Sequence, residues 1–318
     1  MRKVRAALAL CAAILALGGE TVTAAEYKVE KVSGDYKFTE GPVWSPWGTL
    51  LFSDIPATRV YELGAASGQT AARSIGGEIA ASGQKVYREP SGNSNGLTFD
   101  REGRLIACEH GNRRVSRTEK DGKIITVADT HAGKRLNSPN DVVVKSDGSI
   151  YFTDPTYGIK KEEQELDFQG VYRIKPDGKL ELLVKDFKMP NGLCFSPDEK
   201  RLYIADSSEL RHIRAFDVSP DGTLTGGAVF AKVDPGGAPD GMKVDRSGNL
   251  LSTGPGGIWI FDPSGKHIDT IPTPETPANC GWGDEDGRTL YITARTSVYK
   301  VRWSVGGELP GRKKEVAK

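Results

Sequence analysis

One short pattern recurs six times along this chain and constrains its fold more than any other feature. Each copy is an alternating apolar strand, a tight turn with glycine or a polar pair, and a second apolar strand, as in a β-hairpin. The copies occupy residues 43–55, 97–110, 142–155, 193–207, 242–255 and 282–295. Their turns follow one another at intervals of about 40 to 55 residues, which is the spacing of β-propeller blades.

A second, weaker hairpin follows most of these copies, with turns around Asp121, Asp177 and Asp221. Two hairpins per repeat make a four-stranded antiparallel blade, so we predict an all-β fold, a six-bladed β-propeller. Only one strand, at 298–303, follows the sixth hairpin, and we expect residues 27–32 to supply the missing outer strand and close the ring. Two β-sandwich domains or an open solenoid are alternatives, but nothing in the chain marks a linker.

The first 25 residues have the pattern of a secretory signal peptide. A basic start at 1–5 precedes an apolar run at 6–18, and small residues at 22–25 offer a cleavage site. The run is shorter than the ~20 residues that span a bilayer. We therefore expect export to the periplasm or the medium, and no membrane attachment after cleavage. A single domain should then fill residues 26–318, with a disordered tail at 310–318.

The charge balance excludes some classes of partner. The 318 residues include 43 Lys and Arg and 42 Asp and Glu, so we expect no nucleic-acid partner and no attraction to an anionic membrane. The cysteines that remain after cleavage, Cys108, Cys194 and Cys280, are few and far apart, and we expect them to be buried packing residues. The oligomeric state leaves no trace in the sequence.

Six oxygen-bearing side chains stand at matching positions, just before the inner strand of each expected blade. They are Glu40, Asn95, Asn140, Asn191, Asp240 and Asn279. Turn chemistry explains a single Asn-Gly pair, but Glu40 is not a favoured turn residue, and the inner strands of a propeller converge on one channel. Oxygen donors without His or Cys suit a hard cation, and calcium fits best, with magnesium, manganese and zinc as alternatives. The predicted metal ligands are Glu40, Asn140, Asn191 and Asp240.

The second strand of each hairpin runs back to the same face, so its end adds further candidates. Asp206 is predicted as a carboxylate of the pocket, whereas Asp54 and Asp154 are expected to cap their strands. The predicted substrate-binding residues are Asn95, Asn140, His110, Glu109 and Tyr157. The sequence lacks the motifs of serine hydrolases, zinc proteases and nucleotide-binding proteins.

Several of these segments together resemble the gluconolactonase branch of the senescence-marker-protein/regucalcin/gluconolactonase family. They include TEGPVW at 39–44, CEHGNRRV at 108–115 and PNGLCFSPDEKRLYIADS at 190–207, and the resemblance extends from about residue 36 to 300. It implies a six-bladed propeller with a divalent metal, usually calcium, in the channel. The metal-binding residues of the family match Glu40, Asn191 and Asp240, and Asn140 matches an asparagine that contacts metal or substrate. An arginine that binds sugar in the animal branch is replaced here by Ser138.

The resemblance implies metal-dependent hydrolysis of a sugar lactone such as glucono-1,5-lactone. The metal would stabilise the oxyanion as a Lewis acid, and Asp240 or another channel carboxylate (Glu40 or Asp206) would accept a proton from the attacking water. A hydrolase of organophosphates on the same scaffold is one alternative. A non-catalytic propeller that binds a glycan or a protein is another.

Overall fold

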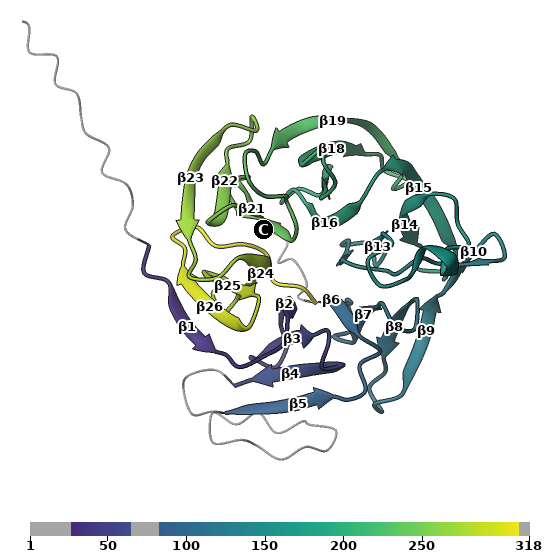
Figure 1. Cartoon of the computed structure of the whole chain (residues 1–318), viewed down its shortest axis with the longest axis horizontal. Coiled ribbons are helices and arrows are strands. Elements are labelled where there is room, and N and C mark those ends of the chain that lie inside the picture. The colour runs from purple at the N-terminus through teal and green to yellow at the C-terminus, as the bar shows by residue number, and fades with distance from the viewer. Residues whose placement is uncertain (1–26, 65–82, 312–318) are drawn as a thin grey trace, which may run out of the picture.

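Six four-stranded antiparallel sheets stand in a ring in the computed structural model, which describes residues 27–64 and 83–311 (Figure 1). Each sheet is one blade, and the predicted six-bladed β-propeller is confirmed. The predicted signal peptide at 1–25 lies outside the described residues. The inner strand of every blade lies next to the central channel, so residues at its start are brought together from all around the ring.

The first three blades follow the hairpin order of the sequence. The first comprises β2 (Thr39–Trp44), β3 (Leu50–Asp54), β4 (Arg59–Leu63) and β5 (Gln84–Arg88). The second comprises β6 (Ser94–Phe99), β7 (Leu105–Glu109), β8 (Arg114–Thr118) and β9 (Ile124–Ala128). The third comprises β12 (Val142–Val144), β13 (Ile150–Asp154), β14 (Gln169–Ile174) and β15 (Leu180–Phe187).

The remaining blades repeat this order. The fourth comprises β16 (Pro190–Phe195), β17 (Arg201–Asp206), β18 (His212–Val218) and β19 (Leu224–Lys232). The fifth comprises β20 (Met242–Val244), β21 (Leu250–Gly254), β22 (Gly257–Phe261) and β23 (His267–Pro272). The sixth comprises β24 (Pro277–Gly283), β25 (Thr289–Ala294), β26 (Ser297–Arg302) and β1 (Glu30–Ser33).

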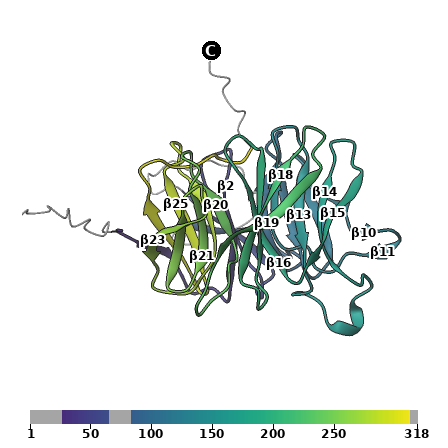
Figure 2. The ribbon, with the colours of Figure 1, turned by 90° about the horizontal axis from the view of Figure 1, so that it is seen from above.

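Within residues 27–64 and 83–311, two small elements lie outside the blades. They are the two-stranded hairpin of β10 (Thr130–His131) and β11 (Lys134–Arg135), and the single 3₁₀ turn η1 (Lys161–Glu163). The segment that carries η1 projects from one face of the ring, and the C-terminal end of the described chain lies at the other face (Figure 2). These two faces provide the reference for the site described below.

The ring is closed by a strand from the start of the described chain. β1 pairs with β26 in antiparallel register, with Glu30 opposite Lys300 and Lys31 opposite Tyr299. The predicted closing strand at 27–32 is thus confirmed, although its paired part begins at Glu30. Because β1 covers the outer edge of the sixth blade, the first and last segments of the propeller share one sheet.

The inner hairpins turn where the sequence places a residue that tolerates a left-handed backbone. Gly48, between β2 and β3, has a φ of 85°, and its N–H donates to the carbonyl of Ser45. In the fourth blade Glu199 takes the left-handed position with a φ of 58°. Such a φ strains a residue with a side chain, so the glycine in the other turns has a conformational reason.

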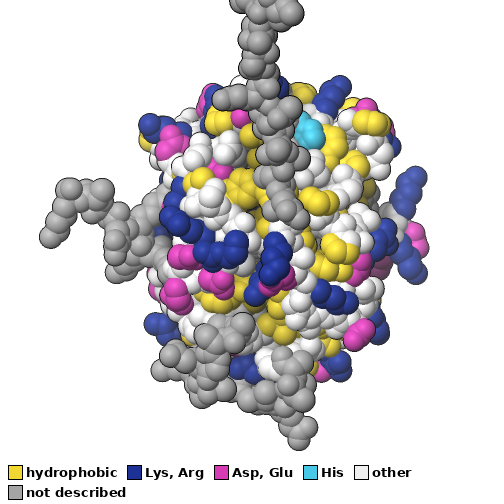
Figure 3. Space-filling view, turned by 90° about the vertical axis from the view of Figure 1, so that its left-hand side faces the viewer, with side chains coloured by type: hydrophobic (Ala, Val, Ile, Leu, Met, Phe, Trp, Pro, Cys, Tyr) yellow, Lys and Arg dark blue, Asp and Glu magenta, His cyan; other side chains and the backbone are white. Residues whose placement is uncertain are grey.

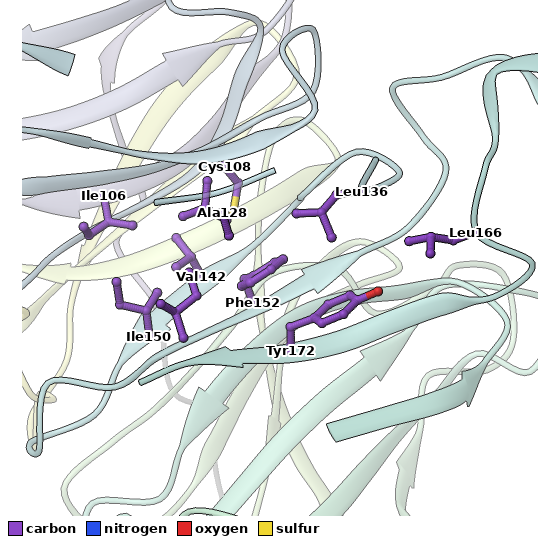
Figure 4. Packing of buried hydrophobic residues seen from close by; sticks show 11 residues of the cluster. Ile106, Cys108, Ala128, Leu136, Val142, Ile150, Phe152, Leu166 and Tyr172 are labelled. Atoms are coloured by element: carbon purple, nitrogen blue, oxygen red, sulfur yellow. The ribbon is translucent and has the colours of Figure 1, made fainter. Parts of the chain in front are cut away.

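The apolar core lies between neighbouring blades. Figure 4 shows the cluster at the junction of the second and third blades, where Phe152 of β13 stacks on Tyr172 of β14 with ring centroids 5.2 Å apart. Cys108 lies fully buried in this cluster, and Cys194 and Cys280 are also buried and free. The expectation of buried packing cysteines is therefore confirmed.

The outer wall carries both signs of charge. Figure 3 views the side with β23, β26 and β1, where basic and acidic side chains are interspersed with apolar ones. Within residues 27–64 and 83–311, no helix has the length and apolar character needed to cross a membrane.

Candidate functional site

The six matched side chains do converge on the channel, but most of them stand inside the inner strand rather than before it. Glu40, Asn95, Asn191 and Asn279 belong to β2, β6, β16 and β24, while only Asn140 and Asp240 precede their strands. The expectation that these residues precede their strands is wrong for the first four. In these blades the inner strand already begins before a bulge, and its pairing resumes beyond the bulge. In the first blade, for example, the register shifts between Glu40 and Val43. A bulge re-aims side chains, and here it lies next to the channel-facing residue.

Hydrogen bonds link neighbouring members of this ring across the blade boundaries. Nδ2 of Asn95 donates to Oδ1 of Asn140 at 2.5 Å, and Nδ2 of Asn140 donates to Oδ1 of Asn191 at 3.1 Å. On the other side of the channel, Nδ2 of Asn279 donates to Oε2 of Glu40 at 3.0 Å. The backbone N–H of Asp240 is held by Oγ1 of Thr253 at 2.8 Å. The ring is therefore a fixed array of amide and carboxylate oxygens.

The two carboxylates of the ring perturb each other. Burial raises the pKa of Glu40 to about 7, and the charge of Asp141 adds to this rise. Burial also raises the pKa of Asp240 well above its usual range, with further contributions from the charges of Glu40 and Asp141. Buried acidic groups that repel one another favour either a proton or a cation between them.

Two charged residues of this region were not predicted from the sequence. Asp141 follows the ring residue Asn140 and is buried, and its Oδ2 accepts no hydrogen bond from any described residue. Lys243 lies on β20, and its positive charge lowers the pKa of both Glu40 and Asp141. Both residues follow a matched ring position within three residues, which is the signal that could have revealed them.

The donor chemistry suits a hard divalent cation. In the described part of the chain, no group of three or more His, Cys, Asp and Glu side chains could hold a metal ion. A cation at the ring would thus need amide oxygens beside the carboxylates of Glu40 and Asp240. Oδ1 of Asn95 is buried and accepts no hydrogen bond from the described residues. Oxygen-only sets of this kind are typical of calcium.

His110 and Tyr157 are brought to the ring, as predicted for residues that bind substrate. Nε2 of His110 lies 3.4 Å from Nδ2 of Asn95, and the hydroxyl of Tyr157 lies 3.4 Å from Nδ2 of Asn191. Burial lowers the pKa of His110 to about 4. The imidazole is therefore neutral at pH 7 and acts as a hydrogen-bonding group rather than a cation.

Glu109, by contrast, is not brought to the ring. Its carboxylate is fully buried and pairs with Arg88 and with Arg114, the latter at 2.8 Å. Asn112 and Ser116 donate to the same two oxygens. A carboxylate that is saturated by partners from its own blade and by Arg88 of the preceding blade has no free oxygen for a sugar, so Glu109 has a structural position.

Asp206 also faces away from the channel. Its oxygens accept the backbone N–H groups of Lys188 at 3.0 Å and Met189 at 3.2 Å, just before the inner strand of the same blade. Asp54 accepts two N–H groups in the first blade in the same way. Oδ2 of Asp154 accepts the N–H of Asn137 in the third. The expected capping role of Asp54 and Asp154 thus extends to Asp206.

The alternation of side chains along the strands explains why some of these residues reach the channel and others do not. The last residues of β3, β7, β13 and β17 are Asp54, Glu109, Asp154 and Asp206. Successive side chains of a strand point to opposite sides, so the residue after each of them points the other way. His110 and Ser207 are such residues, and Ser207 accepts from Nδ2 of Asn191 at 2.9 Å. Ser207 stands at a strand end expected to face the channel mouth but was not predicted as a site residue, and its position after Asp206 is the signal that could have identified it.

A cavity of about 160 Å³ lies further along the same inner strands, beyond the ring. Val43, Leu97, Val143 and Cys194 form apolar parts of its wall, and Lys243 adds an ammonium group. Residues 308–311 also line it. Pro310 and Gly311, which were expected to belong to a disordered tail, are therefore ordered parts of this wall. Residues 312–318 lie outside the described residues.

Known proteins resemble this chain in both sequence and architecture. The family model described as SMP-30/Gluconolactonase/LRE-like region matches residues 38–296. A gluconolactonase of Zymomonas mobilis is 35% identical over 295 residues, which cover 88% of this chain and 82% of that protein.

Solved structures agree with this match. A gluconolactonase of Xanthomonas campestris superposes with a TM-score of 0.76 and 35% identity, covering 87% of this chain and 89% of that one. Regucalcin of Agrobacterium tumefaciens, a calcium-binding protein, gives a TM-score of 0.73 at 19% identity, over 91% and 98% of the two chains. This second likeness shows the fold alone.

Proposed function

Because this chain belongs to the SMP-30/gluconolactonase/LRE-like family and is a lactonase, we propose that it hydrolyses a sugar lactone such as glucono-1,5-lactone to the open acid. The observation that carries the proposal is the ring of two carboxylates and four carboxamides on the channel, linked by hydrogen bonds between blades. Such groups bind the hydroxyls of a sugar and place a carboxylate beside its carbonyl.

We propose that Glu40, Asn140, Asn191 and Asp240 hold one divalent metal, with calcium favoured by the oxygen-only donor set. A cation bound there would supply the positive charge that stabilises the oxyanion formed when water adds to the lactone carbonyl. The raised pKa values of Glu40 and Asp240 support this assignment, since buried acids that repel each other favour a cation between them.

Asp240 is the general base of the proposed reaction. Its burial beside Glu40 raises its pKa, and a raised pKa makes a carboxylate a stronger proton acceptor. It takes a proton from water as the water oxygen bonds to the carbonyl carbon. When the ring C–O bond breaks, the departing oxygen takes this proton back from Asp240 to become a hydroxyl, which regenerates the carboxylate. Asp206 is not assigned this step, because its oxygens accept backbone N–H groups.

His110 and Asn95 are proposed to orient the substrate. Both are nearly buried, and they contact each other at 3.4 Å. A neutral imidazole and an amide offer donors and acceptors to sugar hydroxyls without competing for the metal charge. The free Oδ1 of Asn95 supports this role, since a buried acceptor without a partner favours a ligand that donates to it.

A pH-indicator assay on a panel of aldonolactones tests the proposal, because each hydrolysis releases an acid. We expect turnover of glucono-1,5-lactone that falls on addition of a chelator and returns with calcium. Full activity in the presence of chelator would refute the requirement for a metal. No turnover of any sugar lactone would refute the proposed substrate class. A parallel reaction with diisopropyl fluorophosphate measures the organophosphate alternative.

We further propose that the protein is exported. The support is the basic start, the apolar run and the small residues within positions 1–25. Fractionation of the native host should find the activity outside the cytoplasm, in a chain that begins near residue 26. Activity confined to the cytoplasm with the first 25 residues intact would contradict this.

A further inference from the structure

The segment from Pro155 to Gly158 carries a side chain of the third blade to the fourth. Tyr157 belongs to the loop after β13, and its hydroxyl lies 3.4 Å from Nδ2 of Asn191 on β16. The residue is 46% exposed overall, although burial raises the pKa of its phenol to about 12. The aromatic ring of Tyr157 therefore stands partly in solvent, while its hydroxyl reaches Asn191 at the channel. A phenol in this position remains protonated near neutral pH and can donate a hydrogen bond.

Ser138 fastens both ends of this segment. Its Oγ donates to the carbonyl of Pro155 at 2.7 Å and accepts the N–H of Gly158 at 2.8 Å. Its own N–H also donates to the carbonyl of Pro155 at 3.0 Å. Ser138 is fully buried, so these three bonds exchange little with water, and one side chain fixes the two residues that flank Thr156 and Tyr157.

The same segment packs directly onto the substrate side of the ring. A Cβ added at Gly158 would lie 2.6 Å from Cβ of His110 and 2.9 Å from Cβ of Ser138. Glycine is thus required at this position by close approach. His110 in turn contacts Asn95 of the ring. A shift of the segment would move Tyr157 relative to both His110 and Asn191.

We propose that Ser138 is a positioning residue that holds the Tyr157 hydroxyl at the channel mouth, where this hydroxyl selects polyhydroxylated lactone rings over unsubstituted ones. The inference rests on the proposed sugar-lactone activity and adds to it a determinant of substrate choice. A sugar hydroxyl can accept a hydrogen bond from this phenol, whereas a methylene of an unsubstituted ring cannot. Sites built around a polar partner discriminate against analogues that lack it.

The test compares glucono-1,5-lactone with δ-valerolactone, which has the same ring size and no hydroxyls. For Tyr157→Phe and for Ser138→Ala we expect KM for the sugar lactone to rise about five- to tenfold with kcat little changed, the equivalent of one lost hydrogen bond. For δ-valerolactone we expect kcat/KM to stay within about twofold. In the double variant the losses should not multiply, because both act through the same hydroxyl.

Equal losses on the two lactones would overturn the proposal, since a general distortion of the site affects both. Multiplicative losses in the double variant would also overturn it, because Ser138 would then act independently of Tyr157. Ser264→Ala is the matched control. Ser264 lies in an exposed hairpin turn of the fifth blade, and we expect wild-type kinetics on both lactones.

A second measurement separates this inference from the proposed function. Hydrogen exchange at the Gly158 amide should become faster in Ser138→Ala and stay unchanged in Ser264→Ala, while the thermal shift caused by calcium stays equal in all three proteins. If the wild-type protein hydrolyses no sugar lactone, the proposed function fails, and the exchange result still decides whether Ser138 holds the segment. Unchanged exchange in Ser138→Ala would refute the positioning role.

Discussion

Asp240 and Glu40 are buried carboxylates of the same channel whose charges interact, so the protonation of this pair links the site to the stability of the protein. Both acids have a raised pKa in the folded chain. Between the unfolded pKa near 4 and the folded value, which is about 7 for Glu40, the folded state binds more protons than the unfolded state. The free energy of unfolding of the metal-free protein therefore falls as pH rises through this interval. A metal that replaces the protons removes this loss.

Asp240→Asn should separate these two effects. We expect kcat to fall by about 10²-fold or more through loss of the base and the stabilisation by calcium to disappear. At pH 8 the metal-free variant should be more stable than the metal-free wild type by about 1–2 kcal/mol, because one repelling charge is gone. It should therefore unfold at a higher temperature. Calorimetry at pH 5 and pH 8 with and without calcium measures this.

Asp245→Asn is the control for that experiment. Asp245 is also buried, but its oxygens accept N–H groups of Ser247 and Asn249 in a hairpin turn. This variant should lose stability and keep its response to calcium. If Asp240→Asn instead kept wild-type turnover, the assignment of the base would be wrong.

At the scale of the strand, the acidic residue that ends the second strand in each of the first four blades has a structural role that its chemistry does not reveal. Asp206→Asn replaces an oxygen that accepts backbone N–H groups by an amide that donates. We expect the variant to lose about 1–3 kcal/mol of stability, with kcat of the folded protein within about threefold of wild type. Asp54→Asn, the equivalent change in the first blade, should behave in the same way. A loss of about 10²-fold in kcat for Asp206→Asn alone would show that Asp206 takes part in the reaction.

The repeat pattern predicts the strands well because alternation and turn residues are local properties. It also predicts that Glu40, Asn140, Asn191 and Asp240 share one channel, since equivalent positions of a closed ring must converge. It did not predict the bulge after Glu40, because a bulge changes hydrogen-bond partners without changing the alternation of residue types. The position of Glu109 was missed for another reason: its direction depends on Arg88, a residue of the preceding blade.

At the scale of the whole molecule, the ring holds together because its two ends share the sixth sheet. The outer strand β1 pairs with β26, and a hydrogen bond from the hydroxyl of Tyr27 to Asp269 ties the same segment to the fifth blade. This geometry makes the first described residues part of the fold rather than an appendage. Opening the ring there would expose the edge of β26 and loosen the junction between the fifth and sixth blades.

Deletion of residues 27–33 should therefore destabilise the entire propeller. We expect a loss of about 2–4 kcal/mol from the broken ladder and the uncovered edge, which lowers the melting temperature by roughly 3–7 °C for a domain of this size. The control is Lys28→Ala, which changes a fully exposed side chain before β1 and should leave the melting temperature within about 1 °C. Differential scanning calorimetry measures both. If the deleted protein kept its melting temperature, β1 would not close the ring in solution, and the sixth blade would be stable with three strands.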